Sequence, residues 1–320
     1  MVLVVGRLRS RRRGWGTCGD ALGHAYQLLG FEEAAGGDEV FRLLVLARIV
    51  EPTSKLDSLR VVEEAGFDPP AYATLKRRLP AFAKESWRQK LAAACARTAD
   101  LGPASLVLYD VSTLYFETDA GDGFREPGFS KERRLEPQIT IGLLTDASGF
   151  PLMVNAFEGN RGETTTMLPT IRAFMDAHQL ADVTVVADAG MISAANQQAI
   201  EAAGLSFILG ARIPDVPYAL EVKARALAGL KGHVSNLPDV TAEFVIDAYH
   251  RLFHIEKSFR MSERDLRARP ITTTSASRST RSYRTINIQA GEHTLTAVDP
   301  LPDDLRDAPH PHPRPRCALI

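Results

Sequence analysis

The chain has 320 residues, 45% of them hydrophobic and 24% charged, and its formal net charge is −1. This composition is typical of a globular protein with room for two domains, and it excludes a global basic field. Three widely spaced cysteines exclude a disulfide framework or a zinc cluster, and no apolar run reaches the roughly 18 residues that a membrane span needs. We therefore expect a cytoplasmic protein.

Two stretches of the sequence are locally basic. Residues 7–13 hold five arginines and no acid, and residues 251–269 hold six cations against three acids. Nucleic-acid binding would depend on such local patches, although a solvated surface gives the same pattern. We expect residues 1–19 to form a basic N-terminal arm.

Residues 20–101 are expected to form a small helical domain. The apolar run Val40–Val50 predicts a helix that ends before Pro52, because proline cannot continue a helix. Tyr72–Leu79 and Lys84–Ala99 predict two further helices.

From residue 102 the pattern changes and predicts a mixed α/β domain over residues 102–270. Turn residues at Asp146–Gly149 predict a hairpin between its second and third strands. The expected elements are strands at Leu106–Tyr109, Gln138–Leu144, Pro151–Phe157, Val183–Ala187 and Ser206–Leu209, and helices at Thr164–His178 and Ser193–Ala203.

The last third of the chain is less regular. Residues 211–240 are expected to be loop-like, apart from a short basic helix at Leu220–Leu230, and Ala242–Asp265 predicts a long helix. Residues 271–320 are rich in Thr, Ser, Arg and Pro and have no helical periodicity. This composition predicts a disordered tail.

Two aspartates, Asp110 and Asp188, each follow a buried apolar strand. Ligands gather at the carboxyl ends of strands in α/β sheets, so the two side chains would share one crevice if their strands are neighbours. An aspartate after a strand is also a common turn or helix-cap residue. The pattern alone leaves both interpretations open.

A third acid, Glu256, lies on the long helix. Ala248, Leu252, Ile255 and Phe259 repeat at helical spacing and should face the core, which places Glu256 at the edge of the buried face. Such a carboxylate is either ion-paired or a metal ligand. Three acids near phosphodiesters make chemical sense with Mg²⁺, which takes oxygen ligands and activates in-line displacement at phosphorus.

Four segments together resemble the DDE transposases of bacterial insertion sequences, in the group with an RNase H-like core and a Tyr–Arg–Glu–Lys signature. They are Leu108–Glu117 (LYDVSTLYFE), Phe157–Glu163 (FEGNRGE), Val185–Met191 (VVADAGM) and Tyr249–Ser262 (YHRLFHIEKSFRMS). The resemblance covers roughly residues 38–270.

The resemblance implies an RNase H-like fold and a metal-dependent DNA reaction. Asp110, Asp188 and Glu256 would be the catalytic residues and would hold Mg²⁺, with Mn²⁺ as a substitute. Such an enzyme nicks the terminal repeats of its element and joins the freed 3′-hydroxyl to target DNA, as a homodimer in the DNA complex, at the cytoplasmic nucleoid.

The resemblance also implies the DNA contacts. Tyr249 matches the tyrosine of the signature, and Arg251, Lys257, Arg260 and Arg264 would contact the phosphate backbone, which positions DNA without reading its sequence. The helical segment before residue 100 would help to bind the terminal repeats.

The sequence departs from the signature in several places. Leu252 stands at the position of the arginine, and Glu263 stands at the position of the lysine. Only 67 residues separate Asp188 from Glu256, as if the usual insertion were reduced at 211–240. With the polar tail after residue 270, these departures suggest a truncated or frameshifted copy.

Other interpretations stay open. The chain could be an RNase H-like nuclease that does not join strands, or an inactive remnant that only binds DNA. His250 and His254 have the spacing of a zinc hydrolase, but Arg251 replaces the glutamate that this motif needs. Asp110–Thr113 resembles the aspartyl phosphatase motif, but Ser112 replaces its second aspartate.

Overall fold

The computed structural model describes residues 15–99, 101–102, 105–118, 121–128, 136–191, 193–211, 231–269, 271, 283–290 and 293–300. The chain divides into two compact units, Met1–Ile271 and Thr272–Ile320. The expected basic arm, apart from residues 15–19, and the expected helix at Leu220–Leu230 lie outside the described residues.

The described residues 15–99 are mostly helical, as expected. Asp38 caps α3, because its side chain accepts a hydrogen bond from the Phe41 amide at 2.9 Å. The helix α5 continues past the predicted Leu79 and includes Pro80 in its last turn. The helices are α1 (Trp15–Leu28), α2 (Phe31–Ala34), α3 (Glu39–Val50), α4 (Asp57–Glu64), α5 (Tyr72–Phe82) and α6 (Glu85–Ala99).

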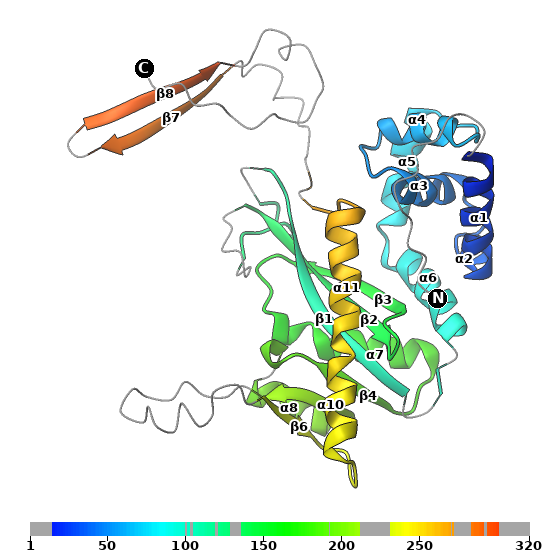
Figure 1. Cartoon of the computed structure of the whole chain (residues 1–320), viewed down its shortest axis with the longest axis vertical. Helices are drawn as coiled ribbons and strands as arrows, with labels where there is room; N and C mark the ends of the chain where they lie inside the picture. The colour runs from blue at the N-terminus through cyan, green and yellow to red at the C-terminus, as the bar shows by residue number, and fades with distance from the viewer. Residues whose placement is uncertain are drawn as a thin grey trace. The chain divides into compact units, whose positions relative to one another are not determined.

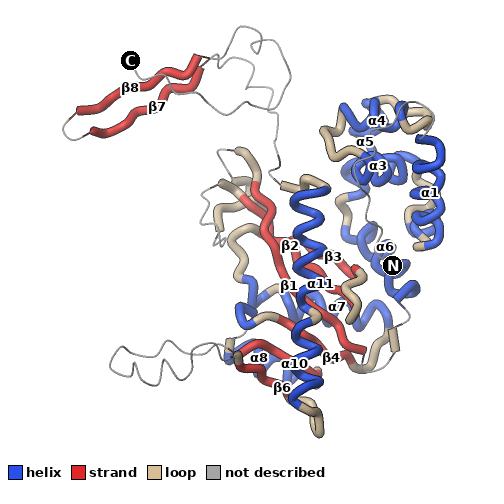
Figure 2. The backbone as a smooth tube through the Cα atoms, in the orientation of Figure 1, coloured by secondary structure: helices blue, strands red, loops and turns tan. Residues whose placement is uncertain are grey.

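A six-stranded sheet in the order β3-β2-β1-β4-β5-β6 forms the centre of the first unit (Figures 1 and 2). The strands are β1 (Ser105–Tyr115), β2 (Gln138–Asp146), β3 (Pro151–Glu158), β4 (Val183–Ala187), β5 (Ser206–Ala211) and β6 (Gly232–Ser235). The strands β1, β4 and β5 are parallel, and β2, β3 and β6 pair with their neighbours in the antiparallel sense. The mixed α/β core expected from the sequence is confirmed.

The remaining helices of this unit lie between or after the strands. Ser193 caps α8 by accepting a hydrogen bond from the Asn196 amide at 3.1 Å, and Thr241 caps α10 through the Phe244 amide at 3.2 Å. The elements are a 3₁₀ turn at Glu163–Thr165, α7 (Met167–His178), a second 3₁₀ turn at Ala189–Met191, α8 (Ala194–Ala202), α10 (Ala242–His250) and α11 (Leu252–Arg260).

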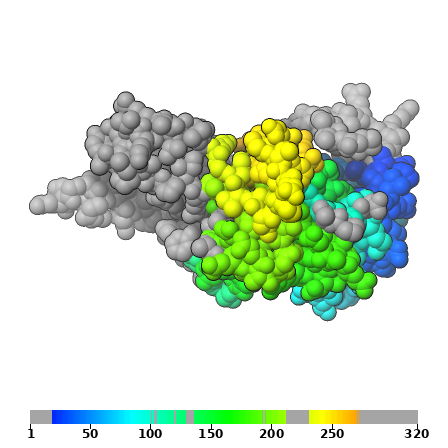
Figure 3. Space-filling model, turned by 90° about the horizontal axis from the view of Figure 1, so that it is seen from below, coloured from blue at the N-terminus to red at the C-terminus, as the bar shows by residue number. Residues whose placement is uncertain are grey.

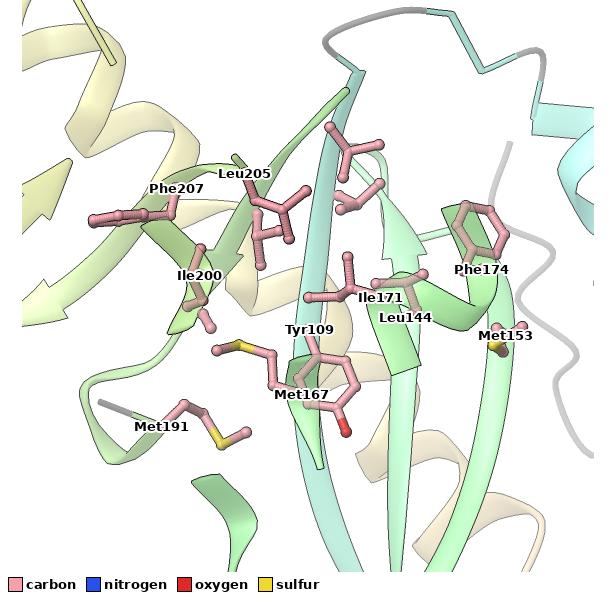
Figure 4. Packing of buried hydrophobic residues seen from close by; sticks show 14 of the residues in the cluster. Tyr109, Leu144, Met153, Met167, Ile171, Phe174, Met191, Ile200, Leu205 and Phe207 are labelled. Carbon is pink, nitrogen blue, oxygen red and sulfur yellow. The ribbon is translucent and has the colours of Figure 1, made fainter. Parts of the chain in front are cut away.

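Different helices cover the two faces of the sheet. Val107 and Tyr109 of β1 belong to the large core, which α6, α7 and α8 complete, whereas Leu108 belongs to the small core under α10 and α11. Figure 4 shows Tyr109 beside Met167 and Ile171 of α7. Strand alternation therefore decides which helices a side chain of β1 meets.

The structure corrects several boundaries. Asp110 lies in the middle of β1 rather than at its end, because β2 continues the pairing as far as Tyr115 opposite Gln138. The single helix expected over residues 242–265 is interrupted at Arg251 and finishes in a π-helical turn, Met261–Asp265. The strand β6 lies in a region expected to be loop-like.

The second unit contains an antiparallel strand pair within the segment expected to be disordered. Its strands are β7 (Tyr283–Ala290) and β8 (His293–Pro300), with Tyr283 opposite Pro300. Apart from Ile271, the rest of that segment lies outside the described residues. Among the described residues, no helix has both the length and the apolar character to cross a bilayer.

Candidate active site

The parallel pairing of β1 with β4 brings Asp110 and Asp188 together. Tyr109 lies opposite Ala187, and each aspartate is the next residue of its chain. Neighbouring strands are roughly 4.8 Å apart, so the two aspartate backbones are adjacent. Since Tyr109 and Ala187 face the large core, alternation directs both carboxylates to the opposite face, under α10 and α11.

Tyr249 of α10 holds the second aspartate. Its hydroxyl donates a hydrogen bond of 2.6 Å to Asp188 Oδ1, and its ring packs at a tilt of 51° against His233, with centroids 4.3 Å apart. Burial, followed by the contact with Asp188, raises the pKa of the tyrosine, so the hydroxyl keeps its proton and remains a donor. Tyr249, predicted to contact DNA, therefore contacts an acid of the site.

Gly210 of β5 makes room for this tyrosine. A Cβ atom at position 210 would lie 2.5 Å from the Tyr249 hydroxyl, which is closer than atoms can approach without moving. The absence of a side chain on β5 is therefore a condition for the contact between Tyr249 and Asp188.

Asp110 and Glu256 line one open pocket of about 360 Å³. The helix α11, which lies along β1, buries Ile255 in the small core and so presents the next residue, Glu256, to this pocket (Figure 1). Asp188 is not among the lining residues. The pocket is lined by Asp110, Val111, Ser112, Tyr115, Glu256, Phe259, Arg260, Glu263, Arg264 and Arg269.

The predicted DNA-contacting cations divide between the pocket and the surface around it. Arg260 and Arg264 line the pocket and are exposed. Arg251, where α10 meets α11, and Lys257 are exposed but do not line it. Figure 3 shows these two helices, in yellow, at the surface beside the green core elements.

The two departures from the signature have structural explanations. Leu252 belongs to the small core and is only 7% exposed, so its position serves packing. Glu263 accepts a hydrogen bond of 2.6 Å from the Ser112 hydroxyl and forms an ion pair of 2.5 Å with Arg269. Sequence reasoning missed Ser112 and Arg269 as residues of this site, and no local pattern marks Arg269.

The two histidines of these helices are exposed and have other neighbours than a zinc site. His254 abuts the turn between β2 and β3, since a Cβ atom at Gly149 would lie 2.5 Å from that of His254. His250 lies near His233, whose pKa is lowered by burial and then by the neighbouring positive charge. Neither contact supports a zinc hydrolase.

The chemistry of the donor set fits Mg²⁺ or Mn²⁺. Both ions prefer carboxylate oxygens, and Mg²⁺ is commonly bound through one or two carboxylates together with substrate phosphates. Asp110 and Glu256 are two carboxylates in one pocket, and Asp188 is next to Asp110 on the sheet. Among the described residues, no three His, Cys, Asp or Glu side chains are already grouped closely enough to hold a metal ion.

A comparison with protein families identifies the family of this chain. A family model described as "Transposase DDE domain" matches residues 102–283, more than half of the chain. The chain belongs to the DDE transposase domain family. The match includes all three acids of the candidate site. No curated protein matches the chain.

Solved structures similar to this transposase domain include two transposase complexes. A piggyBac transposase synaptic complex with hairpin DNA is 11% identical with a TM-score of 0.43, over 69% of this chain and 57% of that chain. A Mos1 transposase paired-end complex with the left transposon end is 13% identical with a TM-score of 0.24, over 71% and 78% of the two chains. This chain therefore spans 57% of the length of the piggyBac chain.

Proposed function

We propose that this chain cleaves and joins DNA strands as the transposase of an insertion sequence, with Asp110, Asp188 and Glu256 as its catalytic acids. The observation that carries the proposal is the pairing of Tyr109 with Ala187, which puts two aspartates side by side on the face that α11 covers. Glu256 of α11 shares a pocket with Asp110.

The three acids would hold Mg²⁺, or Mn²⁺ in its place. When bound, the metal supplies nucleophile activation and stabilises the attacking and leaving oxygens at phosphorus. Water would displace a 3′-oxygen and leave a 3′-hydroxyl at the element's end. That hydroxyl would attack a phosphodiester of target DNA and displace the 3′-oxygen there.

The other residues of the site would orient these groups. Tyr249 fixes Asp188 through its hydroxyl. Arg260 and Arg264 would neutralise the phosphate in the pocket, and Arg251 and Lys257 would contact the flanking backbone. The DNA partners would be the element's terminal repeats and a target duplex, bound by two copies of the chain.

The test is Mg²⁺-dependent nicking and joining of duplexes that carry the element's flanking repeats, with pre-cut ends to isolate joining. We expect Asp110→Asn, Asp188→Asn and Glu256→Gln each to abolish both steps. Glu243→Gln, which alters an exposed acid in the first turn of α10, is the matched control and should remain active.

Metal binding can be followed without activity. Mg²⁺ should raise the unfolding temperature of the wild-type chain, because a ligand that binds only the folded state stabilises it, and should do so less in Glu256→Gln. DNA binding without cleavage by the wild-type chain would favour the inactive remnant. Cleavage without joining of pre-cut ends would favour the nuclease.

A further inference from the structure

Arg269 reaches the pocket from the segment that follows α11 and its π-helical turn. The segment is fixed to the end of β1 and the residues just after it by two backbone hydrogen bonds, from the Ile271 amide to the Tyr115 carbonyl at 3.0 Å and from the Glu117 amide to the Ile271 carbonyl at 3.1 Å. These bonds hold the chain two residues after Arg269. They explain how an arginine outside any helix comes to line the same pocket as Asp110 and Glu256.

The guanidinium of Arg269 binds a carboxylate of its own chain. Its Nη2 atom lies 2.5 Å from Glu263 Oε2, and its Nη1 atom donates to the Thr113 carbonyl at 3.4 Å. The Ser112 hydroxyl donates to the other oxygen of Glu263 at 2.6 Å. The Glu263 side chain is 15% exposed and that of Arg269 is 23% exposed, so the pair is largely removed from water.

The Arg269 guanidinium in this ion pair is also suited to bind a phosphodiester. The planar fork of a guanidinium matches the oxygens of a carboxylate and of a phosphate equally well. Arg260, Arg264 and Arg269 line the pocket together, which gives it three cations beside Asp110 and Glu256. A backbone phosphate entering this pocket would meet Arg269 already paired with Glu263 and would be repelled by that carboxylate.

We propose that Arg269 is a binding residue for a DNA backbone phosphate, and that the phosphate displaces Glu263 from it. Glu263 then acts as an internal competitor that lowers the affinity of the pocket for phosphate until DNA enters. The proposal rests on the proposed function for the kind of ligand, a phosphodiester of duplex DNA. It requires no cleavage.

The test is a double-mutant cycle for DNA binding by the full chain. A fluorescently labelled duplex of random sequence serves as the probe, and EDTA is present so that no divalent metal contributes. The variants are Glu263→Gln, Arg269→Gln and the combination of both. Gln at position 263 keeps hydrogen-bonding groups for Ser112 and Arg269 but removes the competing charge.

We expect Arg269→Gln to weaken binding roughly tenfold, as the loss of one charge-assisted contact predicts. The slope of log affinity against log salt should fall by about 0.9, the value for one phosphate contact. Glu263→Gln should tighten binding several-fold in the wild-type chain, and by clearly less in the Arg269→Gln background, where it removes only the repulsion between the carboxylate and the phosphate. An equal gain in both backgrounds, or an unchanged salt slope in Arg269→Gln, would overturn the proposal.

Two further variants serve as a control and as a substitute for Arg269→Gln. Glu243→Gln removes an exposed acid in the first turn of α10 that does not line the pocket, and we expect it to leave affinity unchanged. If Arg269→Gln does not fold, Arg269→Lys keeps the cation without the planar fork, and we expect weaker binding with an unchanged salt slope. Wild-type affinity in Arg269→Lys would count against the proposal.

Failure of this proposal and failure of the proposed function are distinguishable. The double-mutant cycle measures DNA affinity in the absence of metal. The catalytic proposal is tested by Mg²⁺-dependent nicking and by its loss in Asp110→Asn. An additive cycle with normal nicking would reject only the role of Arg269. A non-additive cycle without nicking would reject only catalysis.

Discussion

Tyr249 is the residue on which the position of Asp188 depends most directly. Its ring is fixed between His233 and the glycine at position 210, and its hydroxyl reaches Oδ1 of the aspartate. The sequence identified Tyr249 as part of the site through the signature. It could not reveal the role, because that depends on which strand faces α10.

Tyr249→Phe removes the hydroxyl and keeps the ring. We expect metal-dependent strand cleavage to fall by about 10–100-fold, the usual cost of losing a group that orients a metal ligand. The unfolding temperature should change little, because the packing of the ring is retained. Tyr72→Phe, on the partly exposed side of α5, is the control. Full activity in Tyr249→Phe would show that the position of Asp188 does not depend on the hydrogen bond from Tyr249.

At the scale of elements, hydrophobic patterning predicted most of the fold. The strand Val183–Ala187 was predicted with its observed ends, because all five residues are buried and four of them are apolar. The strand β6 was not predicted from the sequence, because it has only four residues and none of them is fully buried. The extension of β1 beyond Tyr109 comes from pairing with β2 and has no apolar run of its own.

The same limit applies to the site. Asp110, Asp188 and Glu256 each adjoin a regular apolar pattern, so the sequence could nominate them. Arg269 adjoins none, and its place follows from backbone pairing between Ile271 and β1. Long-range backbone contacts of this kind leave no local signal in the sequence.

Gly149 links the turn of the β2–β3 hairpin to α11. Gly149→Ala should lower the free energy of unfolding by roughly 1–3 kcal/mol for its positive φ alone, and by more because the new Cβ would meet His254. Gly204→Ala is a matched control, with a φ of +71° and no atom within 4 Å of the added Cβ. Urea denaturation should show the larger loss for Gly149→Ala, and equal losses would exclude a tight contact with α11.

His178, in the last turn of α7, should make stability depend on pH. Burial, followed by the charge of Arg97, lowers its pKa in the folded state. The unfolded chain therefore takes up a proton first, and stability present above about pH 6.5 is lost as the pH falls below it. Urea denaturation from about pH 7.5 to pH 5 should show a shallower loss in His178→Gln. An unchanged slope would mean that His178 is as accessible as in the unfolded chain.

At the scale of the whole molecule, the first unit ends where Ile271 pairs with β1. The matched family model continues to residue 283, so the family boundary and the structural boundary differ. The helix α6 packs on β3, which joins the helical segment to the sheet within this unit. The division between a helical domain and a core at residue 101 stays a prediction.

Two shortened chains test this boundary. A chain ending at Ile271 keeps the bonds to β1 and the pair between Arg269 and Glu263, so it should unfold like the full chain. A chain ending at Leu266 leaves Glu263 without Arg269 and should lose at least about 1 kcal/mol of unfolding free energy. Thermal and urea unfolding measure both. Equal stability of the two would show that Ile271 and Arg269 contribute nothing to the fold.

The alignment of Tyr109 with Ala187 also determines which changes of chain length the molecule tolerates. Deleting one residue of β1 ahead of Asp110 would move that aspartate by about 3.3 Å and turn it into the large core, away from its partner. Codons gained or lost between the strands leave this alignment intact. Length variation should therefore accumulate in the connections, while β1 and β4 keep a fixed count of residues.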